Sequence, residues 1–359
     1  MEELGLKIIS NVDSAFLRDS LIGDISLKDI DFTVENHLQW LQETINFNDE
    51  ILVLLLCKDE YDFLPVLENK TNQNPVVLTE HKLGIEAWAV KVVYLHAYSA
   101  LMRLRRDPGQ SDSKTLISLT RIVLLTVADC TTAWNIRKEL VQSSQLAWHI
   151  DSKFSALVLT KHHKSSETFS HRKWLLRQRK LNPDEVQQEI AICHQAAEKY
   201  PNNYNAWSHR IWLVHNFCSQ LKEVLLKELK SSEDFTESHV SDHSGFHYKQ
   251  QMMQCLSGIL PQHEHLQLLQ KEKNFTSDLI LRYPGHESVW NHRRYVVLQL
   301  CKTSDCCDLS SGKKFRLDSP SHLINSEEEF CEQVKTDCID SWQRTLASKH
   351  ANWLCKSLT

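Results

Sequence analysis

A short phrase recurs along this chain in which an aromatic residue is followed three positions later by a basic one. The phrase starts at Trp134, Phe169, Trp207, Phe246 and Trp290, with a weaker copy at Trp88. On a helix, residues three apart lie on the same side, so each copy pairs a ring with a cation. Guanidinium groups bind carboxylates through two parallel hydrogen bonds, which suits them to interfaces between protein chains.

The cations and histidines of these phrases are candidate contact residues. We expect Arg172, Arg210 and Arg293, together with His209, to face another subunit or a substrate. Two alternatives stay open. The arginines could instead bridge carboxylates or cap a neighbouring helix within the chain, and the histidines could be packing residues rather than ligands.

One polar stretch contains three histidines at four-residue intervals, His239, His243 and His247. On one helix they would share a face, as ligands do in zinc sites with that spacing. Gly245 weakens a helix there and no cysteine lies nearby, so we predict no metal in this chain. We expect Asp242, His243 and His247 to contact a subunit or substrate instead. The alternative is a loop that caps the next helix through its polar side chains.

The spacing of the phrase predicts the fold. Successive aromatics lie 46, 35, 38, 39 and 44 residues apart, and a period of this length is typical of stacked helical repeats. Asn182-Pro183 would start one helix, Pro201 to Asn203 would break it, and a second helix would carry the phrase. Aromatics on two sides of that helix suit packing between neighbouring units. We predict an all-α fold, an α-α superhelix of antiparallel helix hairpins forming a right-handed solenoid.

The ends of the chain differ from the repeats. Helical pieces are expected at 4–16 and 34–45, and the apolar run 51–56 is too short to cross a membrane. The predicted organisation is an N-terminal helical extension (1–75), the repeats (76–300), a flexible loop (301–326) and C-terminal helices (327–359).

Composition excludes several classes of protein. With 359 residues, a net charge of −5 and no basic block, the chain is not expected to bind nucleic acid. It has no run of 18 apolar residues, so a membrane span is not expected, and because its first residues lack a basic flank and an apolar core we do not expect a signal peptide. Its 11 cysteines form no CxxC pair, which indicates reduced thiols and a cytoplasmic location.

The residues of two copies carry a resemblance to a known family. The segments 203–212 and 288–295 resemble the repeats of the alpha subunit of the protein prenyltransferases. Further segments, 83–86, 132–135, 200–204 and above all 239–248, resemble more closely the alpha chain of a type 3 geranylgeranyltransferase. The resemblance covers about residues 75–300 and the last helix near Trp353.

The resemblance implies a specific role. Alpha subunits of this family form a crescent of helix hairpins around a separate beta subunit. That beta subunit carries the zinc ion and the geranylgeranyl diphosphate, so no cofactor is expected in this chain. The implied partner is the beta subunit of the Rab geranylgeranyltransferase. The implied substrates are proteins with C-terminal cysteines that already carry a farnesyl group, and the isolated alpha chain would be inactive.

Two positions correspond to family residues near the departing diphosphate. In the family, a Lys stands five residues before the Trp and a Tyr three before it. Here Lys164 fills the Lys position of one repeat and Tyr204 the Tyr position of the next, whereas Ser166 and Asn202 occupy the other two. We expect Lys164 and Tyr204 as catalytic contributors. Their alternatives are a solvated loop cation and a packing residue, and the split pair leaves open a non-catalytic helical-repeat adaptor.

Overall fold

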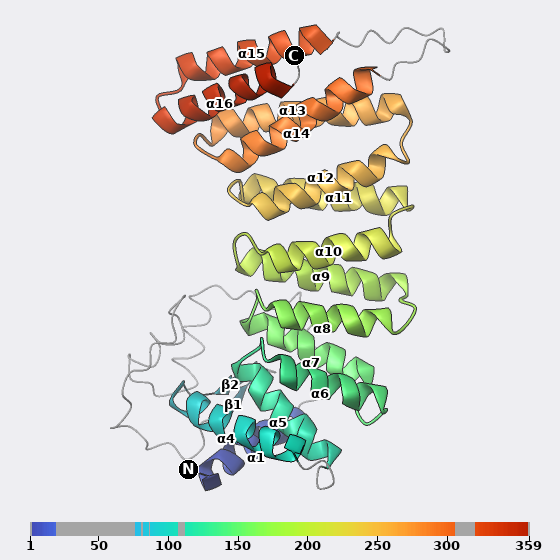
Figure 1. Cartoon of the computed structure of the whole chain (residues 1–359), viewed down its shortest axis with the longest axis vertical. Helices are drawn as coiled ribbons and strands as arrows, with labels where there is room; N and C mark the ends of the chain where they lie inside the picture. The colour runs from blue at the N-terminus through green and yellow to red at the C-terminus, as the bar shows by residue number, and fades with distance from the viewer. Residues whose placement is uncertain are drawn as a thin grey trace. The chain divides into compact units, whose positions relative to one another are not determined.

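The structure is a computed structural model, and its described part contains fourteen helices and one pair of β-strands (Figure 1). The described residues are 2–18, 76–79, 82–85, 87–106, 112–305 and 320–357. The chain divides into two compact units, Met1–Ile192 and Cys193–Thr359, with the boundary inside helix α9. Each unit is described by itself.

The first unit consists of helices and one small β-hairpin, which contacts α1. Its elements are α1 (Glu2–Arg18), β1 (Val76–Thr79), β2 (Lys82–Ile85), α4 (Ala87–Arg106), α5 (Ser113–Thr126), α6 (Thr131–Gln142), α7 (Trp148–Lys161), α8 (Ser166–Arg177) and the start of α9 (Pro183–Lys199). The strands pair antiparallel, with Val76 opposite Ile85 and Thr79 opposite Lys82. The repeat pattern did not predict them, because each strand is only four residues long and precedes the first repeat helix.

Helix α1 packs against α4 and α5 and confirms the helix predicted at 4–16. Ile8 and Val12 are fully buried in the core of this unit. Gly5 permits the close approach, because a Cβ atom there would lie 2.7 Å from Cγ of His96. The helix predicted at 34–45 and the apolar run at 51–56 lie outside the described residues.

The second unit is a succession of helix hairpins. Its further elements are α10 (Tyr204–Phe217), α11 (Lys222–Ser238), α12 (His243–Ser257), α13 (Gln262–Arg282), α14 (Glu287–Asp305), α15 (Pro320–Asp337) and α16 (Ser341–Ser357). Helix α11 pairs with α12, α13 with α14 and α15 with α16, and α12 also contacts α10 and α14. The prediction of an all-α fold built from consecutive helix hairpins is confirmed.

The segment expected to be a loop, 301–326, is helical at both ends. Helix α14 continues to Asp305, and α15 starts at Pro320. Proline is favoured in the first turn of a helix, and Leu323 and Glu327 follow at helical spacing with buried side chains. The closing pair of helices predicted after this segment is confirmed as α15 and α16.

The aromatic phrase lies on the second helix of each hairpin and forms the core. Trp134, Trp207 and Trp290 are each at most 2% exposed, which confirms the packing role of the repeated tryptophans. Three of these helices start at a capping side chain four residues before the aromatic, Ser165, Asn203 or Asp242. Each cap accepts a hydrogen bond from a backbone N–H of the first turn and so fixes where the helix begins.

No helix in the described ranges combines the length and the apolar character needed to cross a bilayer.

Candidate functional site

Every first helix from α7 to α15 buries one carboxylate, and these five side chains are here called the carboxylate row. Each is at most 3% exposed. The row consists of Asp151 on α7, Glu189 on α9, Glu228 on α11, Glu272 on α13 and Glu327 on α15. Such groups are costly to bury unless they are paired and hydrogen-bonded.

The basic residue of the aromatic phrase supplies the first partner. Arg172, for example, donates from Nε to Glu189 Oε1 at 2.8 Å and from Nη2 to Oε2 at 2.5 Å. The five pairs are Arg137 with Asp151, Arg172 with Glu189, Arg210 with Glu228, Lys249 with Glu272, and Arg293 with Glu327. Each pair therefore joins the second helix of one hairpin to the first helix of the next.

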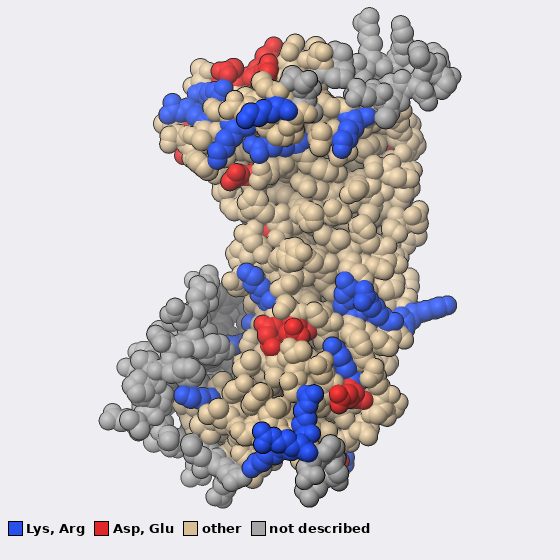
Figure 2. Space-filling view, viewed as in Figure 1, with Lys and Arg blue, Asp and Glu red and all other residues tan. Residues whose placement is uncertain are grey.

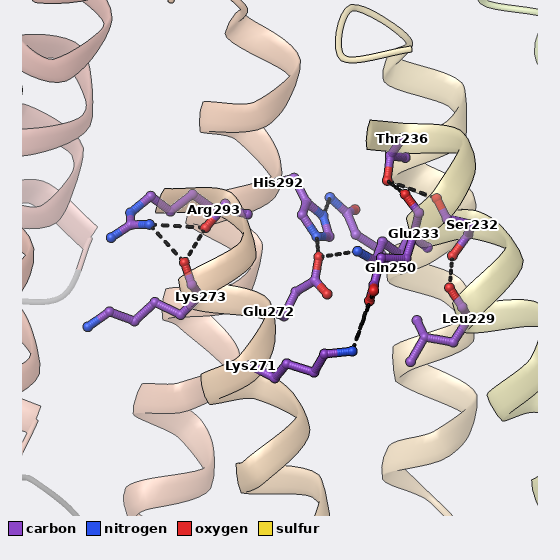
Figure 3. A network of polar contacts seen from close by, with 12 residues as sticks. Leu229, Ser232, Glu233, Thr236, Gln250, Lys271, Glu272, Lys273, His292 and Arg293 are labelled. Atoms are coloured by element: carbon purple, nitrogen blue, oxygen red, sulfur yellow. Dashed lines mark hydrogen bonds and ion pairs between the residues drawn. The ribbon is translucent and has the colours of Figure 1, made fainter. Parts of the chain in front are cut away.

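The second partner of Asp151, Glu228 and Glu272 comes two residues after the aromatic of the following repeat, and that of Glu327 is a histidine of α16. His292 Nε2 donates to Glu272 Oε1 at 2.8 Å, while its Nδ1 lies 3.2 Å from the Gln250 amide, which fixes the tautomer (Figure 3). His171 binds Asp151 and His350 binds Glu327 in the same way. In the α12 repeat Tyr248 replaces the histidine and donates its hydroxyl to Glu228.

The arginines also hold the first helix of their own hairpin. Arg293 Nη1 donates to the Lys273 carbonyl at 3.1 Å (Figure 3). It also donates to Thr276 Oγ1 at 3.0 Å. Arg172 Nη1 makes the corresponding bonds to the Ser152 carbonyl and to Ser155 Oγ. One guanidinium group therefore fixes three helices in register.

Burial and pairing set the protonation states of Glu272 and Glu327, two acids of the carboxylate row. Burial raises the pKa of Glu272, but Lys249 and His292 outweigh it and lower the pKa to about 2. Glu327 likewise has a pKa of about 2, because His350 and Arg293 overcome its burial. Burial lowers the pKa of His292 and of His350. At neutral pH Glu272 and Glu327 are therefore ionised, and His292 and His350 are neutral.

This geometry corrects the expectation that the repeated arginines face a partner. Arg172, Arg210 and Arg293 are at most 2% exposed, and His209 is 4% exposed. They lie between helices of this chain, because the phrase occupies the sandwiched sides of the second helix. The missed signal is a single acid within the apolar stripe of each first helix, such as Glu189 beside Ile190.

The stretch 239–248 is divided by a helix boundary. His239 follows the last residue of α11, whereas His243 begins α12, so the three histidines do not share one helix face. Asp242 is 3% exposed and accepts from the N–H groups of Gly245 and Asn202. Its expected contact role is wrong, and the capping alternative is confirmed. Among the described residues no three His, Cys, Asp or Glu side chains are placed to hold a metal ion.

His243 and His247 lie at the surface of α12, and their contact role stays a prediction. The two residues expected near the diphosphate are also exposed. Lys164 lies in the turn before α8, in the first unit, and Tyr204 begins α10, in the second, with 66% of its surface exposed.

Asn202 stands in the position where the family has a Lys. Its φ is +53°, in the left-handed region that asparagine tolerates better than lysine. Its amide oxygen accepts from the His243 N–H at 2.9 Å. The residue therefore links the α9–α10 turn to the start of α12.

Several known proteins are similar to this chain. A family model described as the protein prenyltransferase alpha subunit repeat matches residues 186–217 and 269–300, which lie within α9–α10 and α13–α14. The chain is 25% identical to the mouse geranylgeranyl transferase type-2 subunit alpha, over 57% of this chain and 37% of that protein. A solved structure of Candida albicans protein geranylgeranyltransferase-I complexed with GGPP aligns at a TM-score of 0.47 and 18% identity, covering 74% of this chain and 90% of that chain.

The human protein prenyltransferase alpha subunit repeat-containing protein 1 is 33% identical, with 82% of this chain and 92% of that protein covered. Because the identity extends over nearly the whole relative, this chain belongs to the family of protein prenyltransferase alpha subunit repeat-containing proteins.

Proposed function

We propose that this chain is the alpha subunit of a heterodimeric protein geranylgeranyltransferase. It would position protein substrates that already carry a farnesyl group against a catalytic beta subunit, that of the Rab geranylgeranyltransferase. The observation that carries the proposal is membership of the alpha subunit repeat family across most of the chain. The relationship to a type-2 geranylgeranyl transferase alpha subunit supports the choice of lipid and of partner.

The surface of α10 and α12 supports a partner-binding role. These two helices contain only two Lys or Arg residues and no Asp or Glu, and both cations, Arg210 and Lys249, are buried in the carboxylate row. Their exposed residues include Tyr204, His215 and His247. In Figure 2 the face of the second unit around these helices shows almost no Lys, Arg, Asp or Glu. Depletion of charge is typical of the centre of a protein interface.

The proposed contribution to chemistry is electrostatic. In prenyl transfer the acceptor thiolate forms the new thioether bond while the bond to diphosphate breaks, and negative charge gathers on the leaving group. A cation such as Lys164 could stabilise that charge, and the Tyr204 hydroxyl could donate to it. Zinc and the prenyl diphosphate would be bound by the beta subunit, as the family resemblance implies.

A second candidate is an adaptor without enzymatic activity, favoured by one observation. Asn202, in the Lys position of the α10 repeat, uses its side chain to bind the start of α12 and offers no cation. The cation of Lys164 and the hydroxyl of Tyr204 therefore come from two different repeats.

Reconstitution separates the two candidates. The tagged full chain is coexpressed with the beta subunit, and the pair is assayed with labelled geranylgeranyl diphosphate and farnesylated or unmodified acceptors. The proposal expects a one-to-one complex that labels farnesylated acceptors. A complex without transfer to any acceptor would favour the adaptor, and failure to copurify would refute the pairing.

A matched pair of variants tests the surface. Because His247 lies on the uncharged face of α12, His247→Glu is expected to weaken beta-subunit binding by about tenfold, a change of about 1.4 kcal/mol. Lys227→Glu, on the exposed side of first helix α11, is the control and should change binding less than twofold.

A further inference from the structure

The last hairpin separates its charges between its two helices. Helix α15 contains five acidic residues and one Lys, whereas α16 contains Arg344, Lys349 and Lys356 and no acidic residue. On the face shown in Figure 2, Lys and Arg side chains gather over α14 and α16. Because of this separation, the charged side chains of α16 are all positive.

Part of this surface is a continuous row of cations and tryptophans, here called the basic strip. Trp342, Lys349, Trp353 and Lys356 lie on one side of α16, because they fall within an arc of about 60° at 100° per residue. Arg294 of α14 borders the strip.

Two cation–aromatic contacts hold the strip together. Lys349 Nζ lies 4.5 Å from the centre of the Trp342 ring, and Arg294 Cζ lies 6.0 Å from the centre of the Trp353 ring. Both distances are within the range of attraction between a cation and a ring face. The strip therefore joins α16 to α14.

The cations of the strip are available to a partner. Lys349 and Lys356 are exposed, and Trp342 is 45% exposed. Within the described ranges neither lysine forms an ion pair with an acid of this chain. Arg294 is partly buried, and its Nη1 donates to an amide oxygen, Asn291 Oδ1, at 3.2 Å, with the Glu287 carboxylate close enough to interact with its charge.

We infer that the basic strip is a docking site for an extended acidic segment of a partner protein. From Trp342 to Lys356 the strip is about 21 Å long at 1.5 Å per residue. An extended chain covers that length with about six residues at about 3.3 Å each. Carboxylates would pair with the three cations, and apolar side chains between them would pack on the two tryptophans.

The composition of the strip favours a peptide over a membrane surface. Stable association with lipid needs a broad apolar face to insert, and the strip offers only two tryptophans, one of them partly buried. The inference depends on the charges of the second unit alone, and it stands whether or not the proposed transferase function is correct.

The test is peptide binding by the full-length chain, measured by fluorescence anisotropy. The probe is a fluorescein-labelled eight-residue peptide with six acidic residues and two leucines, and its control has the acids replaced by the corresponding amides. Wild type should bind the acidic probe at least tenfold more tightly than the amide control. Affinity should fall as the salt concentration rises.

Two double variants with the same change in net charge locate the site. Lys349→Glu with Lys356→Glu should weaken binding at least tenfold. Lys180→Glu with Lys227→Glu changes exposed lysines elsewhere and should weaken it less than twofold. Thermal melts should show all proteins folded, because none of these lysines forms a salt bridge within the described residues.

Three results would overturn the inference. They are no binding of the acidic probe by wild type, an equal loss in both double variants, and binding of phosphatidylserine vesicles that depends on the strip while the peptide does not bind. The last result would assign the strip to a membrane surface.

Discussion

Arg293 on α14 binds both carboxylate oxygens of Glu327 on α15, from Nε at 2.8 Å and from Nη2 at 2.9 Å. Both side chains are at most 1% exposed. His350 on α16 binds the same carboxylate at 3.3 Å, and Lys273 on α13 pairs with it at 3.3 Å. The last two hairpins are therefore joined through one buried carboxylate on α15 that has partners on three further helices, α13, α14 and α16.

Neutralising that charge should destabilise the second unit. Glu327→Gln leaves the Arg293 guanidinium buried without a counter-ion, and losing one partner of a buried pair costs about 3–5 kcal/mol. The measurement is the free energy of unfolding from urea denaturation. Glu329→Gln is the control, because this side chain is exposed on the same helix, and it should change stability by less than about 0.5 kcal/mol. Equal effects of the two variants would contradict a structural role for the pair.

Much of the fold was predictable because it depends on signals between residues that are close together in the sequence. Helix starts follow from capping residues, and the hairpins follow from a repeated aromatic at a constant position. The strands at 76–85 were missed because two four-residue segments give no clear periodicity. The helical ends of the segment 301–326 were missed because most of the segment is rich in Ser, Asp and Lys and has few apolar residues, a composition typical of a loop.

The sequence of a single repeat did not show whether its arginine binds a buried acid or faces solvent. Arg172 has the same sequence context whether its guanidinium faces solvent or a buried acid. The deciding fact is that Glu189, 17 residues further on, lies on the buried side of the next helix. That is a relationship between two helices, and the pattern of one helix does not contain it.

The α12 repeat is the one in which lysine replaces arginine in the described row. Lys249 is fully buried, with Nζ 2.6 Å from Glu272 Oε1 and 3.8 Å from the centre of the Phe275 ring. Lys249→Met should reduce the free energy of unfolding by about 3 kcal/mol, because Glu272 would keep only His292.

The control for this variant is Lys271→Met. Lys271 is exposed and pairs with Glu233 at the surface (Figure 3), where an ion pair contributes about 0–1 kcal/mol. Urea denaturation of both variants compares a buried and an exposed lysine on neighbouring helices. A loss below 1 kcal/mol for Lys249→Met would show that the core tolerates the unpaired carboxylate.

Gly245 should resist substitution because of close packing at the start of α12. A Cβ atom there would lie 3.0 Å from two carbons of the buried Phe235 ring, so Gly245→Ala is expected to cost about 1–3 kcal/mol. Gly258 ends the same helix and would place its Cβ 3.6 Å from the Cys255 carbonyl, an ordinary contact. Thermal melts should therefore show a lower melting temperature for Gly245→Ala and little change for Gly258→Ala.

Acid should destabilise the fold in two stages. Burial keeps His292 and His350 neutral, so the unfolded chain takes up more protons below its histidine pKa of about 6.5, and stability falls as pH drops from there. Glu272 and Glu327 have a folded pKa of about 2 against about 4.5 when unfolded, so their contribution is lost as pH falls through that range. Urea midpoints measured from pH 8 to pH 3 should decline throughout. Glu272→Gln should show a smaller decline below pH 5, and an unchanged slope would show that Glu272 does not control it.

Lys164 offers a direct test of chemistry in the proposed heterodimer. Its side chain is exposed, so Lys164→Ala should leave the melting temperature and beta-subunit binding unchanged. If the cation stabilises the leaving diphosphate, kcat should fall by about 10- to 100-fold with little change in KM, because the interaction strengthens only as the bond breaks. Lys164→Arg should restore most of the rate, and Lys180→Ala, another exposed lysine of the first unit, should have no effect. A normal kcat for Lys164→Ala in an active heterodimer would confine this chain to positioning the substrate.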